Sequence, residues 1–262
     1  MNDSTRYKIM QNREFLKGHG SWDVGAEPTD QQQKFPGTAP VKTPGSSCRI
    51  SLPTDFADIV RDISFMKLLE NRVSRRSYDD RELSLKELAF LLWSTQGIRK
   101  FTGENPRITF RTVPSAGSRH PLETYLFINR VEGLPAGLYH YLPDQWELEC
   151  LDADSDFEEE LTRALCGQHF AAAAPVVFVW SAVPYRTEWR YGLKASKYIL
   201  LDAGHVCENL YLACEAIGCG TCAIGAYDQE CLDELLGFLP GPSAETDYEC
   251  AVYVASVGKI KG

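Results

Sequence analysis

The sequence predicts an α+β fold, in which helices combine with one sheet built from strands that are distant along the chain. Apolar residues recur at helical spacing in three segments, 56–69, 85–96 and 196–217. Apolar or alternating runs bounded by turn residues indicate strands at 107–113, 124–129, 137–141, 146–151, 176–179 and 251–257. The 262 residues suffice for one large domain or two small ones, and they contain no internal repeat.

An N-terminal extension, residues 1–53, precedes the predicted folded domain, residues 54–262. From about Ala26 to Pro53 the chain is rich in glutamine, proline, glycine and serine and has few large apolar residues. Such a segment cannot bury enough surface to offset the entropy lost on ordering. We expect the extension to be partly flexible, either disordered or draped over a partner subunit.

Local signals define the ends of the predicted helices. Thr54-Asp55 can cap the first helix, because a side-chain oxygen there can accept a free N–H group of the first turn. Ser84, with Glu87 three residues later, forms a capping box for the second helix, which Gly97 ends. The third helix, 196–217, is apolar on nearly every face and must therefore lie between other elements. We expect it to pack against a second subunit.

The strand segments differ in their expected exposure. Residues 107–113 alternate apolar and polar side chains, which is typical of a half-buried strand. Segments 137–141 and 146–151 flank Pro143-Asp144 and predict a hairpin. The remaining strand runs are continuously apolar, as expected for strands that are buried on both faces.

The composition argues against several functional classes. A formal net charge of −9 disfavours nucleic acid or an anionic membrane as a partner. No apolar run approaches membrane-spanning length, and residues 1–20 lack the apolar core of a signal peptide. The nine cysteines are an odd number scattered through core-like segments, which is typical of free thiols in a reducing compartment. We therefore expect a cytoplasmic protein.

Three segments predict a binding site for a flat, phosphorylated ligand. In residues 72–76, arginine and serine alternate, so their side chains can converge on one anion. In residues 114–119, a proline-bounded turn of small residues lets the backbone approach a flat ligand closely. In residues 220–225, a glycine-rich turn offers backbone N–H groups to a carbonyl or a ring nitrogen. Together the three segments suggest a flavin.

Each segment also has a purely structural interpretation. The arginines can form a solvated helix end that faces Asp79-Asp80, and residues 114–119 can be a turn between strands. Residues 218–223 formally match the dinucleotide-binding fingerprint, but they follow a long helix instead of a strand, so a glycine cap of that helix is sufficient. Cys219 and Cys222 form a C-x-x-C without a second pair at zinc-like spacing. We expect no metal, while a redox dithiol stays open as an alternative.

Six motifs occur in a defined order along the chain. They are Arg-x-Ser-x-Arg-x-Tyr from 72, Leu-Leu-Trp-Ser-Thr-Gln-Gly from 91, Pro-Ser-Ala-Gly-Ser-Arg-His-Pro-Leu-Glu from 114, Gly-Leu-Pro-Ala-Gly-Leu-Tyr from 133, Leu-Asp-Ala-Gly-His from 201 and Asn-Leu-Tyr-Leu-Ala from 209. In this order they resemble the nitroreductase-like FMN flavoproteins, and within them the SagB-type dehydrogenase branch, from about Leu68 to Gly258. The resemblance implies a central mixed or antiparallel sheet flanked by helices, in an intertwined homodimer.

The resemblance also implies which residues hold FMN. The phosphate and ribityl contacts are Arg72, Ser74 and Arg76, with Val73 contributing only its backbone. The loop that lines the flavin, from below or from the partner subunit, comprises Pro114, Ser115, Ala116, Gly117, Ser118 and Arg119. The backbone donors at the N5 and O4 edge, which stabilise negative charge on the reduced flavin, belong to Cys222, Ala223, Ile224 and Gly225. Ala223 replaces a proline of many relatives, and Lys259 is a second cation on the phosphate side.

Arg190 and Tyr191 are the candidate catalytic residues. The azoline dehydrogenases of the SagB-type branch, which oxidise thiazolines and oxazolines in modified peptides, usually have a Lys-Tyr pair in the similar region. Arg190 holds its proton at any working pH and is a poor base, whereas Tyr191 can still donate a proton. This departure disfavours a peptide-modifying activity. Glu188 and His205 are the other titratable candidates nearby.

These features predict a homodimeric FMN oxidoreductase that works by ping-pong two-electron transfer. NAD(P)H reduces the flavin and leaves, and a nitroaromatic, a quinone or an enone then takes its place and is reduced. An alternative is a SagB-type dehydrogenase that oxidises azoline heterocycles in a modified peptide. Another, from a different class, is a non-catalytic flavin-binding or dithiol interaction module.

Overall fold

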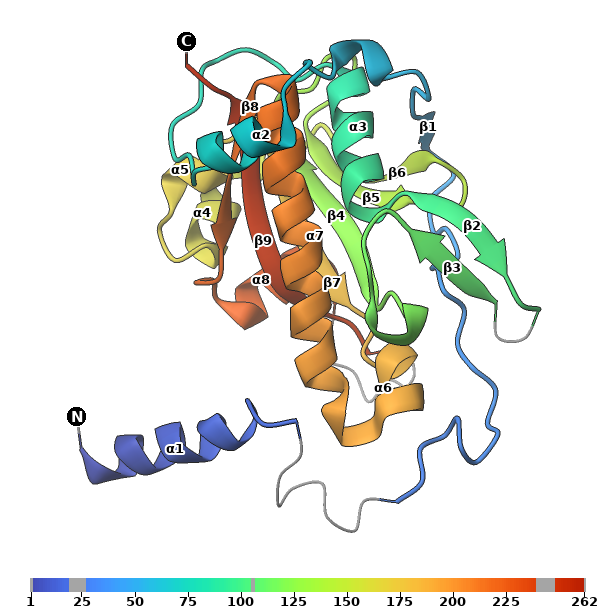
Figure 1. Cartoon of the computed structure of the whole chain (residues 1–262). Helices are drawn as coiled ribbons and strands as arrows, with labels where there is room; N and C mark the ends of the chain where they lie inside the picture. Colours follow the sequence, from blue (N-terminus) through green and yellow to red (C-terminus); the bar gives the residue numbers. More distant parts are fainter. Residues whose placement is uncertain (1, 19–26, 105–106, 239–247, 262) are drawn as a thin grey trace.

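A computed structural model describes residues 2–18, 27–104, 107–238 and 248–261. Its centre is a seven-stranded antiparallel sheet with the strand order β1-β6-β5-β4-β7-β9-β8 (Figure 1). The strands are β1 (Arg49–Ser51), β4 (Leu122–Ile128), β5 (Gly137–Leu142), β6 (Glu147–Ala153), β7 (Val176–Ala182), β8 (Cys219–Ile224) and β9 (Cys250–Lys259). A separate hairpin pairs β2 (Ile98–Thr102) with β3 (Ile108–Arg111).

Helices cover both faces of the sheet, which confirms the α+β class. α3 (Leu85–Gln96) and α7 (Ala195–Ile217) lie on one face, and α4 (Glu158–Ala164) and α8 (Gln229–Leu235) on the other (Figure 1). Side chains alternate along β4, so that Leu126 joins the core under α3 and α7 while Phe127 joins the opposite core. The remaining helices are α1 (Asp3–Glu14), α2 (Phe65–Asn71), α5 (His169–Ala172) and α6 (Tyr185–Tyr191), with 3-10 turns at Ala57–Ile59, Ala116–Ser118 and Gly192–Lys194. No helix in the described ranges has both the length and the hydropathy needed to cross a bilayer.

Local signals located α3 and several strands correctly. The N–H of Glu87 donates to Ser84 Oγ at 3.2 Å, and the N–H of Ser84 donates to Glu87 Oε2 at 2.9 Å, which confirms the capping box. The helix ends at Gly97, as predicted. The predicted hairpin is formed by β5 and β6, and the continuous apolar runs 176–179 and 251–257 lie in the neighbouring buried strands β7 and β9.

The single helix predicted over 56–69 is wrong. A 3-10 turn at Ala57–Ile59 is followed by extended chain, and α2 begins only after Ser64, whose Oγ accepts the N–H of Lys67 at 3.3 Å. The interruption has a tertiary cause. The N–H of Arg61 donates to the Ala216 carbonyl at the end of α7 at 2.9 Å, so this part of the chain serves as a cap for another helix.

The glycine-rich turn predicted over 220–225 is also wrong, because most of it is β8, an edge strand paired along its length with β9. The predicted glycine cap of the preceding helix is confirmed at Gly218, the residue before β8. Gly218 ends α7 with φ +73°, and its N–H donates to the Cys214 carbonyl. The left-handed glycine turns the chain back sharply, and the open edge of β9 then binds the following residues as a strand.

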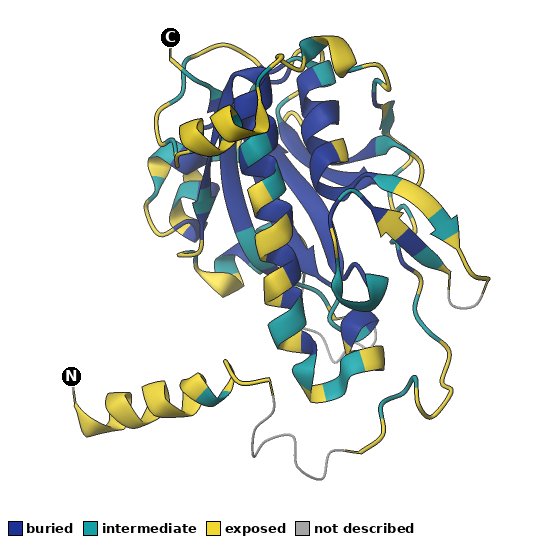
Figure 2. Cartoon of the chain, in the orientation of Figure 1, coloured by how far each residue is buried: buried dark blue, intermediate teal, exposed yellow. Residues whose placement is uncertain are grey.

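α7 is buried on one side only. Ile199, Val206 and Leu210 are buried against α3 and the sheet. The opposite side exposes Leu200, Leu201, Gly204, His205 and Glu208. Figure 2 shows exposed turns along the middle of α7, below α2. A single chain therefore leaves a strip of α7 exposed in which the apolar Leu200 and Leu201 lie close to the polar His205 and Glu208.

The N-terminal extension lies along its own chain wherever the structure describes it beyond residue 26. β1 pairs with β6, and the carbonyl of Pro40 accepts a hydrogen bond from the buried Arg111 guanidinium at 2.9 Å. Residues 19–26 lie outside the described residues. The domain boundary near residue 54 stays a prediction.

Candidate functional site

The hydroxyl of Tyr211 joins two of the three predicted segments. It lies 2.8 Å from Ser74 Oγ and accepts the N–H of Ala223 at 2.9 Å. The guanidinium of Arg72 lies over the Tyr211 ring, 5.3 Å from its centre. Residues 72–76 and β8, about 150 residues apart in the sequence, therefore form one surface under α7.

The backbone fixes this arrangement. The N–H of Arg75 donates to the Thr221 carbonyl at 2.9 Å, and Ser74 forms a parallel bridge with Thr221. Arg75 is paired with Glu215 at 3.2 Å, whereas Arg72 and Arg76 form no ion pair with any described residue. Two guanidinium groups without a carboxylate partner suit a doubly charged phosphate.

The geometry of β8 shows which of the predicted backbone N–H groups, those of residues 222–225, can face a ligand. The N–H of Ala223 points away from β9 because it donates to Tyr211, so strand alternation directs the N–H groups of Cys222 and Ile224 towards β9. Gly225 follows the strand, is exposed, and has no atom within 4 Å of the position a Cβ would take. Of the four predicted residues, Gly225 is therefore the one with room for a ligand at its backbone.

Lys259 has a partner of its own. Its ammonium group forms an ion pair with Glu87, the capping-box residue at the start of α3. Lys259 lies opposite Cys219 in the β8–β9 register, close to the Arg75 side of the surface. Its charge is already neutralised, which weakens its assignment as a phosphate ligand.

The third predicted segment is held by a carboxylate of α7. Ser115 Oγ donates to Asp202 Oδ2 at 2.5 Å, and the N–H of Ala116 donates to Asp202 Oδ1 at 3.1 Å. The N–H of His120 donates to Ser115 Oγ at 2.9 Å, so His120 bonds within its own loop. Burial raises the pKa of Asp202 and lowers that of His120 to about 3. Asp202 was not among the predicted site residues, although a carboxylate within an apolar helix could have indicated it.

Gly117 brings this loop against the two candidate catalytic residues. It has φ +56°, and a Cβ there would lie 2.6 Å from the Tyr191 hydroxyl and 2.9 Å from Arg190 Nε. A side chain at this position would have to displace both groups, and the positive φ would strain it. Arg119 is buried instead of facing a ligand, because its Nε donates to the Arg186 carbonyl and its guanidinium lies over the Trp189 ring.

The two halves of the predicted site lie at different ends of α7. Asp202 holds the loop 114–119 and Tyr211 holds the arginine segment, nine residues further along. At 1.5 Å per residue they are separated by about 14 Å along the helix axis. Figure 1 shows the same separation, with α2 and β8 at one end of α7 and α6 at the other.

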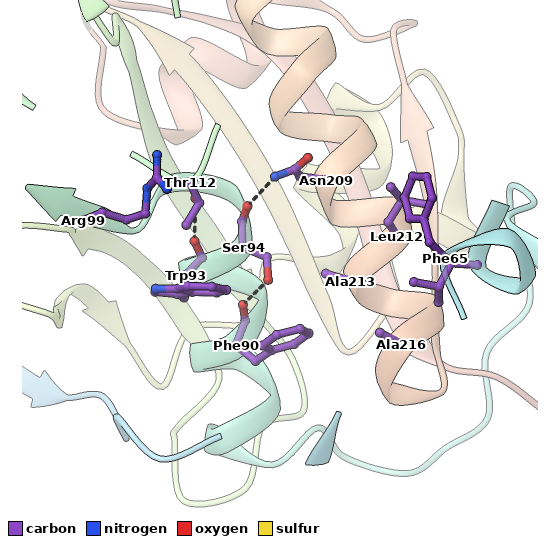
Figure 3. A pocket seen from close by; sticks show the side chains of 11 residues that line it. Phe65, Phe90, Trp93, Ser94, Arg99, Thr112, Asn209, Leu212, Ala213 and Ala216 are labelled. Atoms are coloured by element: carbon purple, nitrogen blue, oxygen red, sulfur yellow. Dashed lines mark hydrogen bonds between the residues drawn. The ribbon is translucent and has the colours of Figure 1, made fainter. Parts of the chain in front are cut away.

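Two hollows adjoin these halves. A groove of about 390 Å³ runs between α2, α3 and α7, where Phe65, Trp93 and Leu212 give it an apolar lining (Figure 3). Asn209 ties its walls together by donating to the Ser94 carbonyl at 2.9 Å. A cavity of about 810 Å³ lies beside Arg190 and Tyr191.

A buried ionic network lies beneath the loop 114–119. Arg186 pairs with Glu123 at 2.6 Å, and His140 bridges Glu123 at 3.1 Å and Glu149 at 2.8 Å. Burial alone would lower the pKa of His140, but its two carboxylate partners outweigh burial and raise it. Burial likewise opposes ionisation of Glu149, yet the hydrogen bonds from His140 and from the N–H groups of Ser46 and Gly45 lower its pKa to about 2. The network joins the N-terminal extension to α6.

Cys219 and Cys222 do not form a dithiol. Both are buried, and residues three apart on a strand point to opposite faces of the sheet. Burial raises the pKa of Cys219 to about 12 and also raises that of Cys222. Among the described residues, no cluster of histidine, cysteine and carboxylate side chains is suited to a metal ion.

Known proteins show the same sequence pattern. The sequence profile of the nitroreductase family matches residues 69–256. MJ1384 of Methanocaldococcus jannaschii, which bears the name of a nitroreductase, is 34% identical over 187 residues, 71% of this chain and 88% of that protein. The trifolitoxin-processing protein TfxB of Rhizobium leguminosarum bv. trifolii is 30% identical over 146 residues, 52% of this chain and 38% of that protein.

Solved structures share the fold. A nitroreductase-type structure from Ralstonia eutropha has a TM-score of 0.63 at 26% identity, covering 87% of this chain and 95% of that one. A chain of the microcin synthetase McbBCD complex of E. coli has a TM-score of 0.56 at 19% identity, covering 100% and 95%, and shows the fold alone. The match to TfxB supports the SagB-type branch. From its profile match and its relatives, the chain belongs to the nitroreductase family.

Proposed function

We propose that this protein is an FMN-dependent oxidoreductase that transfers two electrons from NAD(P)H to an oxidised small molecule. The observation that carries the proposal is the Tyr211 hydroxyl, which brings the arginine segment and β8 together into one surface. Membership of the nitroreductase family supports oxidoreductase chemistry at that surface. FMN would supply the hydride chemistry, while the protein supplies binding, orientation and electrostatics.

The residues on this surface fit the FMN phosphate. Arg72 and Arg76 offer guanidinium forks without an ionic partner, and Ser74 offers a hydroxyl beside them. Arg75 would not take part, because Glu215 already engages it. Tyr211 would orient Ser74, and Gly225 would offer its N–H group to the ring edge.

A homodimer would complete the site. The α7 residues that hold the loop 114–119 and the arginine segment are offset by about 14 Å along the helix axis, and we infer that each arginine segment is completed by the loop of the partner. A second copy packed on the exposed strip of α7 and on the groove in Figure 3 would bring its own loop to that surface. Leu200 and Leu201 are each more than half exposed, and a partner subunit would remove this apolar surface from water.

The chain's own groups would act on the acceptor from α6. Tyr191 can donate a proton from a hydroxyl that lies beside the Gly117 backbone. Arg190 would stabilise negative charge that develops on a nitro group, a quinone or an enone. The loop 114–119 would exclude water from one side of the ring.

The proposal is tested by the flavin itself. Purified protein should show flavin absorbance, and Arg72→Ala combined with Arg76→Ala should lower FMN affinity by about tenfold or more, because charge-assisted hydrogen bonds are lost. Arg81→Ala is the matched control, since this exposed arginine pairs with Asp79 away from Tyr211. A wild-type protein that is colourless and takes up no added FMN contradicts the proposal.

A second candidate, oxidation of azolines in a modified peptide, is favoured by one finding, the relation to TfxB. Aerobic turnover of a thiazoline-containing peptide without NAD(P)H would establish it. A flavin-bound protein that oxidises neither NAD(P)H nor a thiazoline would indicate a non-catalytic flavin module instead. The opposed orientations of Cys219 and Cys222 argue against a dithiol module.

A further inference from the structure

The N-terminal extension contributes a wall to the space beside the candidate catalytic residues. Residues 27–36, here called the strap, cross the helix α6. The N–H of Gln31 donates to the Trp189 carbonyl at 2.8 Å, and Trp189 Nε1 donates to the Phe35 carbonyl at 3.0 Å. These two bonds fix the strap to the turn of helix that directly precedes Arg190.

Side chains hold the strap at a second point. The hydroxyl of Tyr185 donates to Asp30 Oδ2 at 2.5 Å. Thr29 reaches the turn after α6, because its Cγ2 lies 3.5 Å from the position that a Cβ on Gly192 would take. The strap therefore touches both ends of α6.

The chain that follows the strap is anchored in the core. The buried Arg111 guanidinium binds the Pro40 carbonyl, and Glu149 accepts the N–H groups of Gly45 and Ser46 at 2.8 and 2.9 Å. Glu149 belongs to the buried network that ends at Arg186 of α6. The same helix is thus tied to the extension from two directions, and its position depends on the extension.

A cavity of about 810 Å³ lies between the strap and α6. Thr29 and Asp30 line one wall, and Arg190, Tyr191 and Leu193 line the other. The volume is near the upper end of the range for drug-sized ligands. One aromatic ring would fill only part of it. The ring of Tyr191 packs edge-on against Tyr198 at 4.7 Å, which adds an aromatic surface suited to a flat ligand.

We propose that the strap is the outer wall of the acceptor site and that Thr29 and Asp30 determine specificity, favouring flat acceptors with several fused rings. This rests on the proposed function, which places the acceptor beside Arg190 and Tyr191. A multi-ring acceptor would reach from these residues to the strap and contact both walls. A one-ring acceptor would contact α6 alone.

The test compares a bulky side chain placed on the strap with the same side chain placed elsewhere on the extension. Thr29→Trp narrows the cavity from the strap side, Thr29→Ala trims the wall, and Ser47→Trp adds the same side chain at an exposed position outside the cavity. Equilibrium binding of the three-ring probe anthraquinone-2-sulfonate to the oxidised protein as purified needs no turnover. On the same samples, flavin absorbance measures how much cofactor is bound. Steady-state assays with NADPH give KM and kcat for the three-ring probe, and these are compared with KM and kcat for 1,4-benzoquinone.

Thr29→Trp should weaken binding of anthraquinone-2-sulfonate and raise its KM by about tenfold, because the indole would occupy the strap side of the cavity that the three-ring probe needs. The KM for 1,4-benzoquinone, the flavin absorbance, and the binding of the three-ring probe by Ser47→Trp should stay within about threefold. Thr29→Ala, which removes only the wall contact, should weaken that binding by less than Thr29→Trp does. Equal effects of Thr29→Trp on both quinones, no effect on either, or a wild type that does not bind the three-ring probe would overturn the strap proposal. Loss of the proposed function is seen separately, as absent flavin or absent NADPH oxidation in the wild type.

Discussion

Ser74 and Tyr211 are in hydrogen-bond contact, with 2.8 Å between Oγ and the phenolic oxygen, although 137 residues separate them. The same phenolic oxygen accepts the N–H of Ala223. One hydroxyl thus holds the arginine segment and β8 together. The sequence does not predict this contact, because Tyr211 lies in an apolar helix, where a tyrosine is expected to be an ordinary core residue.

Tyr211→Phe should weaken FMN binding by about 5- to 30-fold, which corresponds to roughly 1–2 kcal/mol for the lost hydrogen bonds. The phenylalanine ring still lies under Arg72, so the change isolates the hydroxyl. FMN titration followed by fluorescence measures the effect, with the exposed Tyr248→Phe as control. Unchanged affinity in Tyr211→Phe would show that the contact has no part in cofactor binding.

Gly117→Ala should reduce turnover strongly and lower stability by more than the backbone strain alone. The added Cβ would lie 2.6 Å from the Tyr191 hydroxyl. Gly133→Ala is a matched control, since Gly133 also has positive φ, at +78°, but no atom within 4 Å of its Cβ position. Strain at such a site costs roughly 1 kcal/mol. Thermal melting and NADPH oxidation that are equal in the two variants would contradict the close approach.

Replacing Cys219 and Cys222 together with serine or alanine should leave flavin reduction by a nicotinamide within about threefold of wild type. Their side chains point to opposite faces of β8, and burial raises the pKa of both thiols. Stopped-flow absorbance checks the rate. Alkylation should mark the exposed Cys48 and Cys166 first. Loss of most activity with flavin still bound would establish a redox role after all.

Glu149→Gln should destabilise the fold by about 3 kcal/mol near neutral pH, because it removes one partner from a buried ion pair. The pKa of Glu149 is lowered from its ordinary 4.5 to about 2. Its contribution to the free energy of unfolding is therefore complete above pH 4.5 and is lost as the pH falls towards 2. The gap in melting temperature between wild type and variant should narrow over this range. His140, whose pKa is raised above 6.5, contributes below pH 6.5 and loses its contribution as the pH rises through its folded value.

Glu147→Gln is the control for that series, since its pairing with Arg49 at 3.5 Å is partly exposed. Such a pair is worth about 0–1 kcal/mol. If Glu149→Gln and Glu147→Gln cost the same at pH 7, the buried network does not hold the extension to the sheet.

Gly204→Leu should weaken a dimer without harming the single chain. No atom of the same chain lies within 4 Å of a Cβ at Gly204, and leucine favours helix over glycine by about 0.5–1 kcal/mol. On the exposed strip of α7, however, the larger side chain would disrupt a close subunit contact. Sedimentation and flavin absorbance over a dilution series should show dissociation together with FMN loss. A wild-type monomer that keeps its flavin would refute the two-subunit site.

The sequence alone determined the features that depend on neighbours along the chain. The capping box of Ser84 and Glu87, the glycine end of α7 at Gly218 and the β5–β6 hairpin all follow from contacts within a few residues. The order of the motifs was enough to predict the nitroreductase family, which the profile match confirms.

The tertiary structure decided what depends on distant partners. β8 is a strand because β9 offers an open edge, and the helix predicted over 56–69 is broken because Arg61 binds the end of α7. The separation of the two half-sites is likewise a distance along α7, which no motif encodes. Hydrogen bonds between segments more than a hundred residues apart select among local conformations of similar energy, and a pattern read along the chain contains no information about which distant group will supply them.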